Sequence, residues 1–341
     1  MAETMKRWEM SAIGREHLAL TEVAIPKARA GEVLVRVHAV SLNYRDKLVI
    51  ETGMGLPLAF PFTPGSDLAG EVVGMGEGAD RFAVGDRVIS TFTPGWLDGR
   101  PAGDARHPPY KTLGGAWPGV LSQYVAFPQD WFVRSPETLD FVQSSTLPCA
   151  GLTAWFALVE RGDLQSGQTV ALQGTGGVSL LALQIARSRG ARVVISSGDD
   201  EKLARAVALG ADLGVNRHDE DWVEAVRTFT DDAGADHILE LVGGAHLNRS
   251  LEAVAVQGRI SLIGVLDGFD FSGSSGLLIT KSPVIQGINV GHRRALEDFV
   301  AEIDRIQLKP AVDTVYPLAE LPAALDHLDR GAFGKIVITL V

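Results

Sequence analysis

The chain of 341 residues contains one cysteine, Cys149, which excludes an internal disulfide and any site built from several thiolates. It also lacks a clustered run of Lys and Arg. With a net charge of −11, nucleic acid and anionic membrane surfaces are poor partners. No apolar run is long enough to span a bilayer, and residues 1–15 lack the apolar core of a signal peptide. These absences favour a cytoplasmic protein with a small-molecule substrate.

The length and the apolar pattern predict two domains of different character. A chain of 341 residues exceeds what one hydrophobic core usually serves. The first third predicts short strands between Gly and Pro turns, with clear alternation at 32–40 and a long irregular stretch at 92–119. Beyond residue 140, strand-like runs alternate with helix-patterned segments. That alternation is typical of an α/β fold, with a parallel sheet covered by helices on both faces.

A glycine-rich turn at 173–178 (QGTGGV) gives the first indication of a ligand. It lies between a short apolar strand at 169–172 and a helix-patterned segment at 178–189, and a second strand follows at 192–196. This is a βαβ unit of about 30 residues. Glycine lets the backbone approach a ligand closely, and the N–H groups at the start of a helix can face a pyrophosphate. The turn therefore predicts a bound dinucleotide.

Several further motifs occur in a fixed order along the chain. They are 31–37 (GEVLVRV), 41–46 (SLNYRD), 64–72 (PGSDLAGEV), 84–88 (VGDRV), 147–154 (LPCAGLTA) and 334–337 (GKIV). Together with the glycine turn, they resemble the medium-chain dehydrogenase/reductase superfamily along essentially the whole chain. The resemblance implies a GroES-like catalytic domain at 1–130, completed by 290–341, and a Rossmann nucleotide-binding domain at 131–289. It also implies that substrate binds in the cleft between them.

Many members of this superfamily hold a catalytic zinc with a Cys-His pair, a Gly-His-Glu motif and a later Cys. Here Asn43-Tyr44 and Gly65-Ser66-Asp67 stand in the first two places, and only Cys149 remains in the third. Zinc takes about four ligands and prefers nitrogen or sulfur donors, which this set does not supply. The chain therefore resembles the zinc-independent branch of quinone oxidoreductases, enoyl reductases and metal-free alcohol dehydrogenase-like proteins. Cys149 is expected to be a small buried residue rather than a metal ligand.

The expected cofactor site combines the glycine turn with the ends of later strands. Its predicted members are Thr153, Gly174, Thr175, Gly176, Gly177, Val178, Ser196, Ser197, Lys202, Val242, Gly243, Ile263, Gly264, Val265, Ile288, Asn289 and Val290.

The second strand of the βαβ unit carries the preference between cofactors. Sites for NAD usually place Asp or Glu there, about 20 residues past the turn, to accept from the ribose 2′-OH. Here the position holds Ser196-Ser197, which can donate to a 2′-phosphate, and Lys202 can reach it as a point charge. This favours NADPH. NADH stays open, since Asp199 could serve a ribose if the strand ends later, and Lys202 could be an ordinary solvated residue.

Without a metal, negative charge on the substrate oxygen needs hydrogen-bond donors. The resemblance places Asn43, Tyr44 and Arg45 near the floor of the cleft. Enoyl reductase domains of fatty-acid and polyketide synthases use a Lys and an Asp as suggested proton donors, and Lys281 and Asp67 could match them. Three of these candidates have a structural alternative. Tyr44 could pack between domains, Arg45 could pair with Asp46 or Asp67, and Lys281 could lie on a surface loop.

The predicted function is zinc-independent hydride transfer between NAD(P)H and a quinone, an enone or an aldehyde/alcohol pair. The alternative is a protein that binds NADPH without catalysis and serves as a structural or sensing module. Four aromatic residues of the two long loops could form a substrate lid or anchor the loops: Phe92, Trp96, Trp117 and Phe269. A homodimer or larger homo-oligomer is expected, because the Rossmann sheet of this family commonly extends across a dimer interface.

Overall fold

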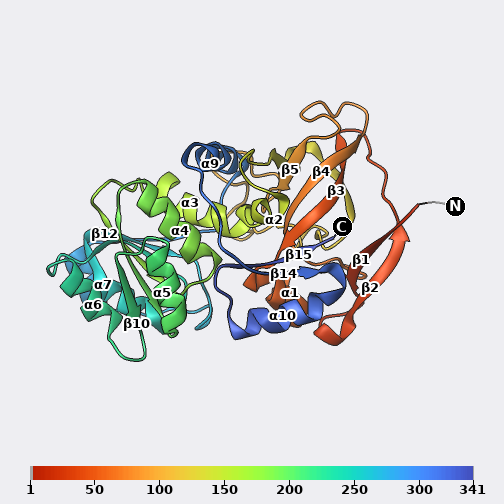
Figure 1. Cartoon of the computed structure of the whole chain (residues 1–341). Helices are drawn as coiled ribbons and strands as arrows, with labels where there is room; N and C mark the ends of the chain where they lie inside the picture. The colour runs from red at the N-terminus through yellow and green to blue at the C-terminus, as the bar shows by residue number, and fades with distance from the viewer. Residues whose placement is uncertain (1–2, 341) are drawn as a thin grey trace. The chain divides into compact units, whose positions relative to one another are not determined.

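The computed structural model describes residues 3–340 and divides into two compact units (Figure 1). The first unit contains residues 1–152 and 290–341, and the second contains residues 153–289. The boundary between Leu152 and Thr153 differs from the predicted one at 130/131. The reason is that strand β7 (Phe132–Arg134) pairs with β5 (Arg87–Ser90) and so belongs to the first unit's sheet.

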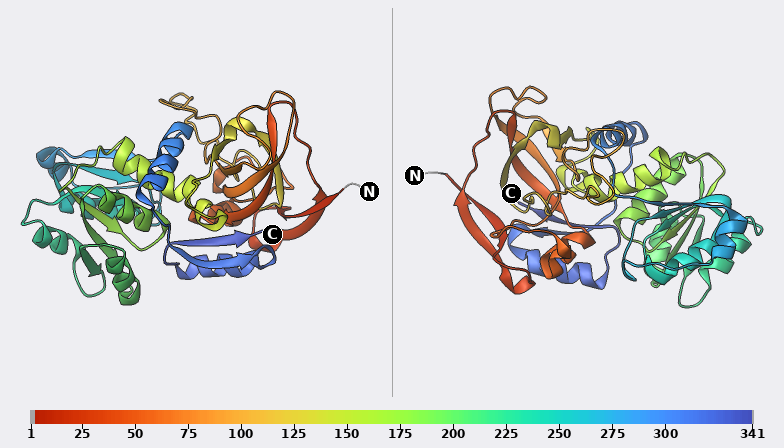
Figure 2. Two further views of the ribbon diagram at one scale, coloured as in Figure 1. Left: turned by 45° about the horizontal axis from the view of Figure 1, so that its top comes forward. Right: turned by 180° about the vertical axis from the view of Figure 1, so that it is seen from behind.

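The first unit is built on a seven-stranded sheet with the order β14-β15-β3-β4-β5-β7, and β6 also pairs with β3. A separate antiparallel pair is formed by β1 and β2. The remaining strands are β1 (Thr4–Met10), β2 (Leu18–Ala24), β3 (Glu32–Ser41), β4 (Asp67–Met75), β6 (Tyr124–Pro128), β14 (Val312–Pro317) and β15 (Lys335–Thr339). The C-terminal strand β15 lies antiparallel to β3, as the blue and red-orange ribbons of Figure 2 show.

Helices α1 (Tyr44–Thr52), α2 (Phe141–Ser144), α9 (Arg293–Ile306) and α10 (Leu321–Arg330) complete the first unit. The apolar residues that alternate along β3, such as Val33, Val35 and Val37, are fully buried in its core. Residues 91–123 contain no helix or strand, as predicted for 92–119. Phe92 and Trp96 of this stretch are buried, so both anchor the loop, whereas Phe269 of the second loop is exposed.

The second unit is a doubly wound sheet of six parallel strands, with the order β10-β9-β8-β11-β12-β13. Its strands are β8 (Thr169–Gln173), β9 (Arg192–Ser197), β10 (Leu213–Asn216), β11 (Ala235–Glu240), β12 (Val254–Leu262) and β13 (Val284–Gly287). The chain order reverses between β8 and β11. In open α/β sheets, ligands bind beyond the carboxyl ends of the strands at such a reversal.

Five helices connect these strands: α4 (Gly177–Ser188), α5 (Asp200–Ala208), α6 (Trp222–Phe229), α7 (Leu247–Ala253) and α8 (Ser275–Lys281). Right-handed crossovers place α4 and α5 on one face of the sheet and the other three on the opposite face. Consistent with this, α7 packs against both α6 and α8. The remaining helix, α3 (Leu152–Trp155), contains the boundary between the units. Among residues 3–340, no helix is long and apolar enough to cross a membrane.

Candidate active site and nucleotide-binding edge

A buried polar cluster surrounds the start of α1 in the first unit. Asn43 lies just before the helix, and its N–H donates to Oδ2 of Asp46 at 2.8 Å, while the N–H of Asp46 donates to the carbonyl of Asn43. These reciprocal bonds satisfy N–H groups that the first helical turn leaves without partners. Both side chains are buried. The helix start therefore fixes Asn43 below the surface of the unit.

Ser66 and Asp67 lie next to Asn43, at the start of β4. Nδ2 of Asn43 donates to Oγ of Ser66 at 3.3 Å, and Oγ of Ser66 donates to Oδ1 of Asp67 at 2.6 Å. The other carboxylate oxygen of Asp67 accepts from the N–H of Cys149 at 2.9 Å. Burial raises the pKa of Asp67 to about 6, against the opposing attraction of Lys335. Three segments far apart in the sequence, at 43, 66–67 and 149, thus share one hydrogen-bonded chain.

Lys335 was missed by sequence reasoning, although it belongs to the 334–337 motif. It is buried on β15, and its Nζ donates to the carbonyl of Leu42 at 2.6 Å and to Oδ1 of Asn43 at 2.5 Å. The pairing of β15 with the end of β3 brings Lys335 to this position, because Leu42 N–H donates to the carbonyl of Ile336. A buried ammonium group must be paired, and here its partners are the cluster itself.

The three remaining candidates for catalysis have other surroundings. Arg45 is buried, and its guanidinium donates to Oδ1 of Asp46, to Oγ1 of Thr112 and to the carbonyls of Leu113 and Gly114. Arg45 thus forms an internal ion pair with Asp46 and also holds the loop at 112–114 in place. These contacts match the structural alternative for Arg45, and its catalytic role stays an untested prediction.

Tyr44 is 42% exposed at the start of α1, and Nζ of Lys47 lies 5.5 Å from its ring centroid. It lies next to Asn43 in the sequence, but its ring is outside the buried cluster.

Lys281 lies at the wrong edge of the second unit's sheet for a catalytic group. It ends α8, before the start of β13, and Nζ donates to the carbonyls of Glu252 and Val254 at 2.8 Å each. Those carbonyls lie at the start of β12, whereas the glycine turn follows the end of β8. Because the strands are parallel, the two groups occupy opposite edges. Through these bonds the lysine ties α8 to β12, and its role as a proton donor stays an untested prediction.

The residues at the zinc positions do not fit a zinc ion. Oδ1 of Asn43 already accepts from Lys335, and the hydroxyl of Ser66 donates to Asp67. Burial, followed by the charge of Asp67, raises the pKa of Cys149, which disfavours the thiolate at this position. A thiolate is the form that binds metals. Among the described residues, no group of three His, Cys, Asp or Glu side chains could hold a metal ion.

The glycine turn of the second unit fits a dinucleotide phosphate. Gly174 has a φ of 74°, and a Cβ built on Gly174 or Gly176 would meet no atom within 4 Å. Gly176 immediately precedes α4, and no side chain caps that end of the helix. Open space in front of uncapped N–H groups is what a pyrophosphate requires. Thr175, Gly177 and Val178 belong to the same turn, and Ser179 donates to the carbonyl of Gln173.

Two basic residues that sequence reasoning missed lie beside the predicted serines. Ser196 and Ser197 end β9, as expected. A Cβ built on the next residue, Gly198, would come within 2.8 Å of Nη2 of Arg217 and within 2.5 Å of Nε2 of His218. Arg217 directly follows β10, and its N–H donates to the carbonyl of Ser197. A guanidinium and an imidazole therefore lie beside the strand end where a ribose would lie.

Asp199 forms the N-terminal cap of the helix that follows, α5. It caps α5 by accepting from the N–H of Lys202 at 3.0 Å, and Nζ of Lys202 lies 4.0 Å from its Oδ2. Oδ1 of Asp200 accepts from Asn216. Because β9 ends at Ser197, neither aspartate occupies the strand-end position that would bind a ribose 2′-OH.

A buried carboxylate, Glu240, holds the glycine turn in place through hydrogen bonds. Glu240, the last residue of β11, accepts from Nε2 of Gln173 at 2.9 Å, from Ser250, from His246 and from the N–H groups of Val242 and Gly243. Burial alone would raise the pKa of Glu240, but these bonds lower it to about 2. Gln173 immediately precedes Gly174, so this network ties the turn after β8 to the turn after β11.

The later strand-end residues were also predicted at this edge. Gly243 and Gly264 lie where the turns after β11 and β12 touch: a Cβ on Gly264 would come within 1.7 Å of the carbonyl oxygen of Leu241. Ile263, Gly264 and Val265 follow β12, and Ile288 donates to the carbonyl of Leu262. Asn289 ends the second unit, and Val290 begins the returning part of the first. Thr153 is buried in α3.

Val290 has a φ of 54°, which is rare for a β-branched residue. Strain of this kind persists only where the surroundings fix it, and it is concentrated at functional sites.

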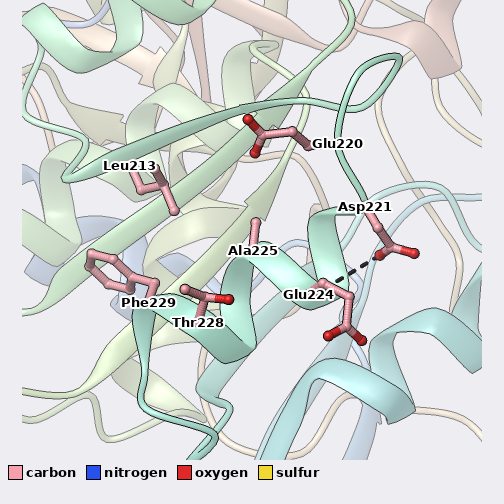
Figure 3. A pocket seen from close by; sticks show the side chains of 7 residues that line it. All are labelled: Leu213, Glu220, Asp221, Glu224, Ala225, Thr228 and Phe229. Carbon is pink, nitrogen blue, oxygen red and sulfur yellow. Dashed lines mark hydrogen bonds between the residues drawn. The ribbon is translucent and has the colours of Figure 1, made fainter.

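The pocket of Figure 3 is separate from both regions. It lies along α6 and the edge strand β10, and it is lined by Leu213, Glu220, Asp221, Glu224, Ala225, Thr228 and Phe229. Asp221 caps α6 and pairs with Arg249. None of these lining residues follows β8, β9 or β11, so the pocket has no part in the site.

Comparisons with known proteins agree with this geometry. Residues 29–137 match the alcohol dehydrogenase GroES-like domain, and residues 177–305 match the zinc-binding dehydrogenase domain. The chain is 35% identical to a zinc-type alcohol dehydrogenase-like protein of Schizosaccharomyces pombe, over 96% of each chain. The chain belongs to the medium-chain dehydrogenase/reductase superfamily. It is an NAD(P)-dependent oxidoreductase of that superfamily, with the GroES-like and Rossmann folds that the motifs predicted.

Two further relatives show how far the likeness extends. The chain is 26% identical to the human quinone oxidoreductase, over 96% of this chain and 95% of that protein. The crystal structure of an alcohol dehydrogenase candidate from Sinorhizobium meliloti 1021 has a TM-score of 0.97 and 59% identity, and 99% of each chain is covered.

Proposed function

We propose that this protein is an NADPH-dependent oxidoreductase that works without zinc and reduces electrophilic acceptors such as quinones and conjugated enones. The observation that carries the proposal is the state of the three zinc-ligand positions. Asn43 and Ser66 are bonded to Lys335 and Asp67, and Cys149, which is half-buried rather than fully buried as expected, carries a thiol whose pKa is raised. Acceptors that are already electrophilic need less polarisation than a simple aldehyde. Relatives named quinone oxidoreductase support this choice.

The preference for NADPH is supported by charge at the end of β9. Ser196 and Ser197 occupy the strand end without a carboxylate, and Arg217, His218 and Lys202 supply donors around it. A guanidinium can bind a phosphate through two parallel hydrogen bonds. The same groups would have no anionic partner on the ribose of NADH.

The nicotinamide, when bound, supplies a hydride to the electrophilic carbon, and the electron pair of the substrate moves to its oxygen. Asn43 is the residue that we assign to that oxygen. An amide nitrogen carries two hydrogens: one donates to Ser66, and the Asn43 amide also stabilises the Asp67 carboxylate by a hydrogen bond, so in this proposal the substrate oxygen takes over that second hydrogen. The second hydrogen can donate to the oxygen as its charge develops, from a group already fixed in place. Gly174 to Val178 hold the pyrophosphate, and the Glu240 network keeps that turn in position.

The direct test is a comparison of NADPH and NADH with a panel of acceptors. Binding is followed by nicotinamide fluorescence and turnover by absorbance, with a quinone, an α,β-unsaturated ketone and an aldehyde as acceptors. We expect tighter binding of NADPH and the highest kcat/KM with the quinone or the enone. Tight binding of NADPH without turnover on any acceptor would instead indicate a non-catalytic nucleotide-binding protein.

We also propose a homodimer through the open edge of the second unit's sheet. Strand β13 is the last strand in the sheet order, and Val284 on it and Ile279 on α8 are exposed. An unpaired edge with apolar side chains is suited to pairing with a second copy. Sedimentation velocity of the protein should give a dimer, and Val284→Lys should shift it toward the monomer.

A further inference from the structure

The one buried ammonium group of the polar cluster has no role in the function proposed so far. Lys335 is 4% exposed, and its two hydrogen-bond partners are the carbonyl of Leu42 and Oδ1 of Asn43. Its bond to Asn43 has a chemical consequence. An ammonium can only donate, so the atom that faces it must be the amide oxygen, and Nδ2 must face Ser66.

The surrounding charges show why a cation lies here. Asp46 and Asp67 are both fully buried, and Arg45 binds Asp46. That pairing leaves Asp67 with Lys335 as its counter-charge, since Lys335 attracts both carboxylates. A buried carboxylate without a cation would be costly, because its charge is poorly screened inside a protein.

We infer that Lys335 is a positioning residue for hydride transfer, which acts through Asn43. Its ammonium group orients the amide and draws electron density toward Oδ1, so that Nδ2–H becomes a stronger donor to the substrate oxygen. Hydrogen bonds in series polarise one another in this way. The inference rests on the proposed function, because it assigns Asn43 to that oxygen.

Three substitutions separate orientation from charge. Lys335→Gln keeps a donor for Oδ1 of Asn43 but removes the charge, and Lys335→Met removes both. We expect kcat to fall by about 10-fold in the first and by about 100-fold in the second, with the dissociation constant of NADPH unchanged. Lys6→Met, at an exposed position of strand β1, is the control and should keep the wild-type kcat.

A double-mutant cycle excludes a merely structural role. If Lys335 acts through Asn43, then Lys335→Met should cost much less in an Asn43→Ala background than in the wild type. Additive losses in kcat would overturn the inference. Asn43→Asp serves if Lys335→Met does not fold, because a carboxylate still pairs with Lys335 but has no N–H to donate. Wild-type kcat in Asn43→Asp would also overturn it.

The pH profile is an independent readout. Asp67 faces Lys335, Asp46, Ser66, Asn43 and the N–H of Cys149, and the charge of Lys335 lowers its pKa more than the hydrogen bonds of Ser66 and Asn43 do. Removal of the Lys335 charge should therefore move the acidic limb of the kcat profile to higher pH. An unmoved limb in Lys335→Gln would contradict the electrostatic part. Absence of wild-type turnover on every acceptor would refute the proposed function instead, so the two failures are distinguishable.

Discussion

Oγ of Ser66 donates to Oδ1 of Asp67 at 2.6 Å, and both residues are completely buried. The resemblance of the 64–72 motif places this serine where zinc-dependent members of the superfamily carry the histidine of Gly-His-Glu. Here the hydroxyl turns to the neighbouring carboxylate, and the carboxylate also accepts from the N–H of Cys149. The three zinc-ligand positions, Asn43, Ser66 and Cys149, are thus joined through hydrogen bonds that include Asp67. A site closed in this way can act through its donors, but it offers no open set of ligands.

Arg217→Ala should impair NADPH much more than NADH. Loss of a charge-assisted bond to a phosphate costs about 1.5–3 kcal/mol, which corresponds to about a 10- to 100-fold rise in the KM for NADPH. The KM for NADH should hardly change. Steady-state kinetics with both cofactors measure this, and Arg330→Ala, on the exposed end of α10, is the matched control. Equal losses with both cofactors would remove Arg217 from the 2′-phosphate site.

Lys281→Met should lower stability and leave kcat unchanged. Two buried carbonyls lose their shared donor, which costs about 1–3 kcal/mol in the free energy of unfolding. Denaturant unfolding and steady-state kinetics on the same preparation measure both quantities. Lys335→Met provides the contrast, because we predict that this variant loses kcat. A large fall of kcat in folded Lys281→Met would restore the lysine as a proton donor.

Glu240→Gln should destabilise the second unit in a pH-dependent way. The variant places an N–H₂ group against the donors Gln173 and Ser250, at a cost of about 1–3 kcal/mol at pH 7. The folded-state pKa of Glu240 is lowered from 4.5 to about 2, so its contribution is complete above pH 4.5 and is lost as the pH falls toward 2. The difference between wild type and variant, from denaturant unfolding, should therefore narrow over that range.

The control for this variant is Glu224→Gln, an exposed carboxylate on α6 that pairs with Arg227. Exposed pairs contribute little, so its unfolding free energy should stay within about 0.5 kcal/mol of wild type. A pH-independent difference for Glu240→Gln would mean that the carboxylate is not held ionised by the network.

The elements of the second unit could be predicted because their patterns are local. The strand predicted at 169–172 and the helix predicted at 178–189 each lie within one residue of β8 and α4. The same holds for the glycine turn, where the spacing of the residues determines the backbone. The short helix α8 was missed, because its Ser- and Gly-rich start resembles a loop.

The site in the first unit could be predicted only in part. Asn43 and Asp67 were identified through motifs, but Lys335 bonds to a residue 292 positions away, and no local pattern reports such a contact. Arg217 was missed for a similar reason: the end of β10 was visible, yet only the pairing of β10 with β9 brings its side chain to Gly198. The place of Lys281 could not be predicted, because a motif position does not reveal at which edge of a sheet a side chain lies.

Metal content and activity, measured on one sample, test the central claim most directly. The purified protein is dialysed against a strong chelator, its zinc is quantified by atomic emission, and kcat/KM is measured with NADPH and a quinone or enone. The account predicts a protein without stoichiometric zinc that keeps its full kcat/KM. Loss of activity on dialysis, restored by one equivalent of zinc, would contradict it.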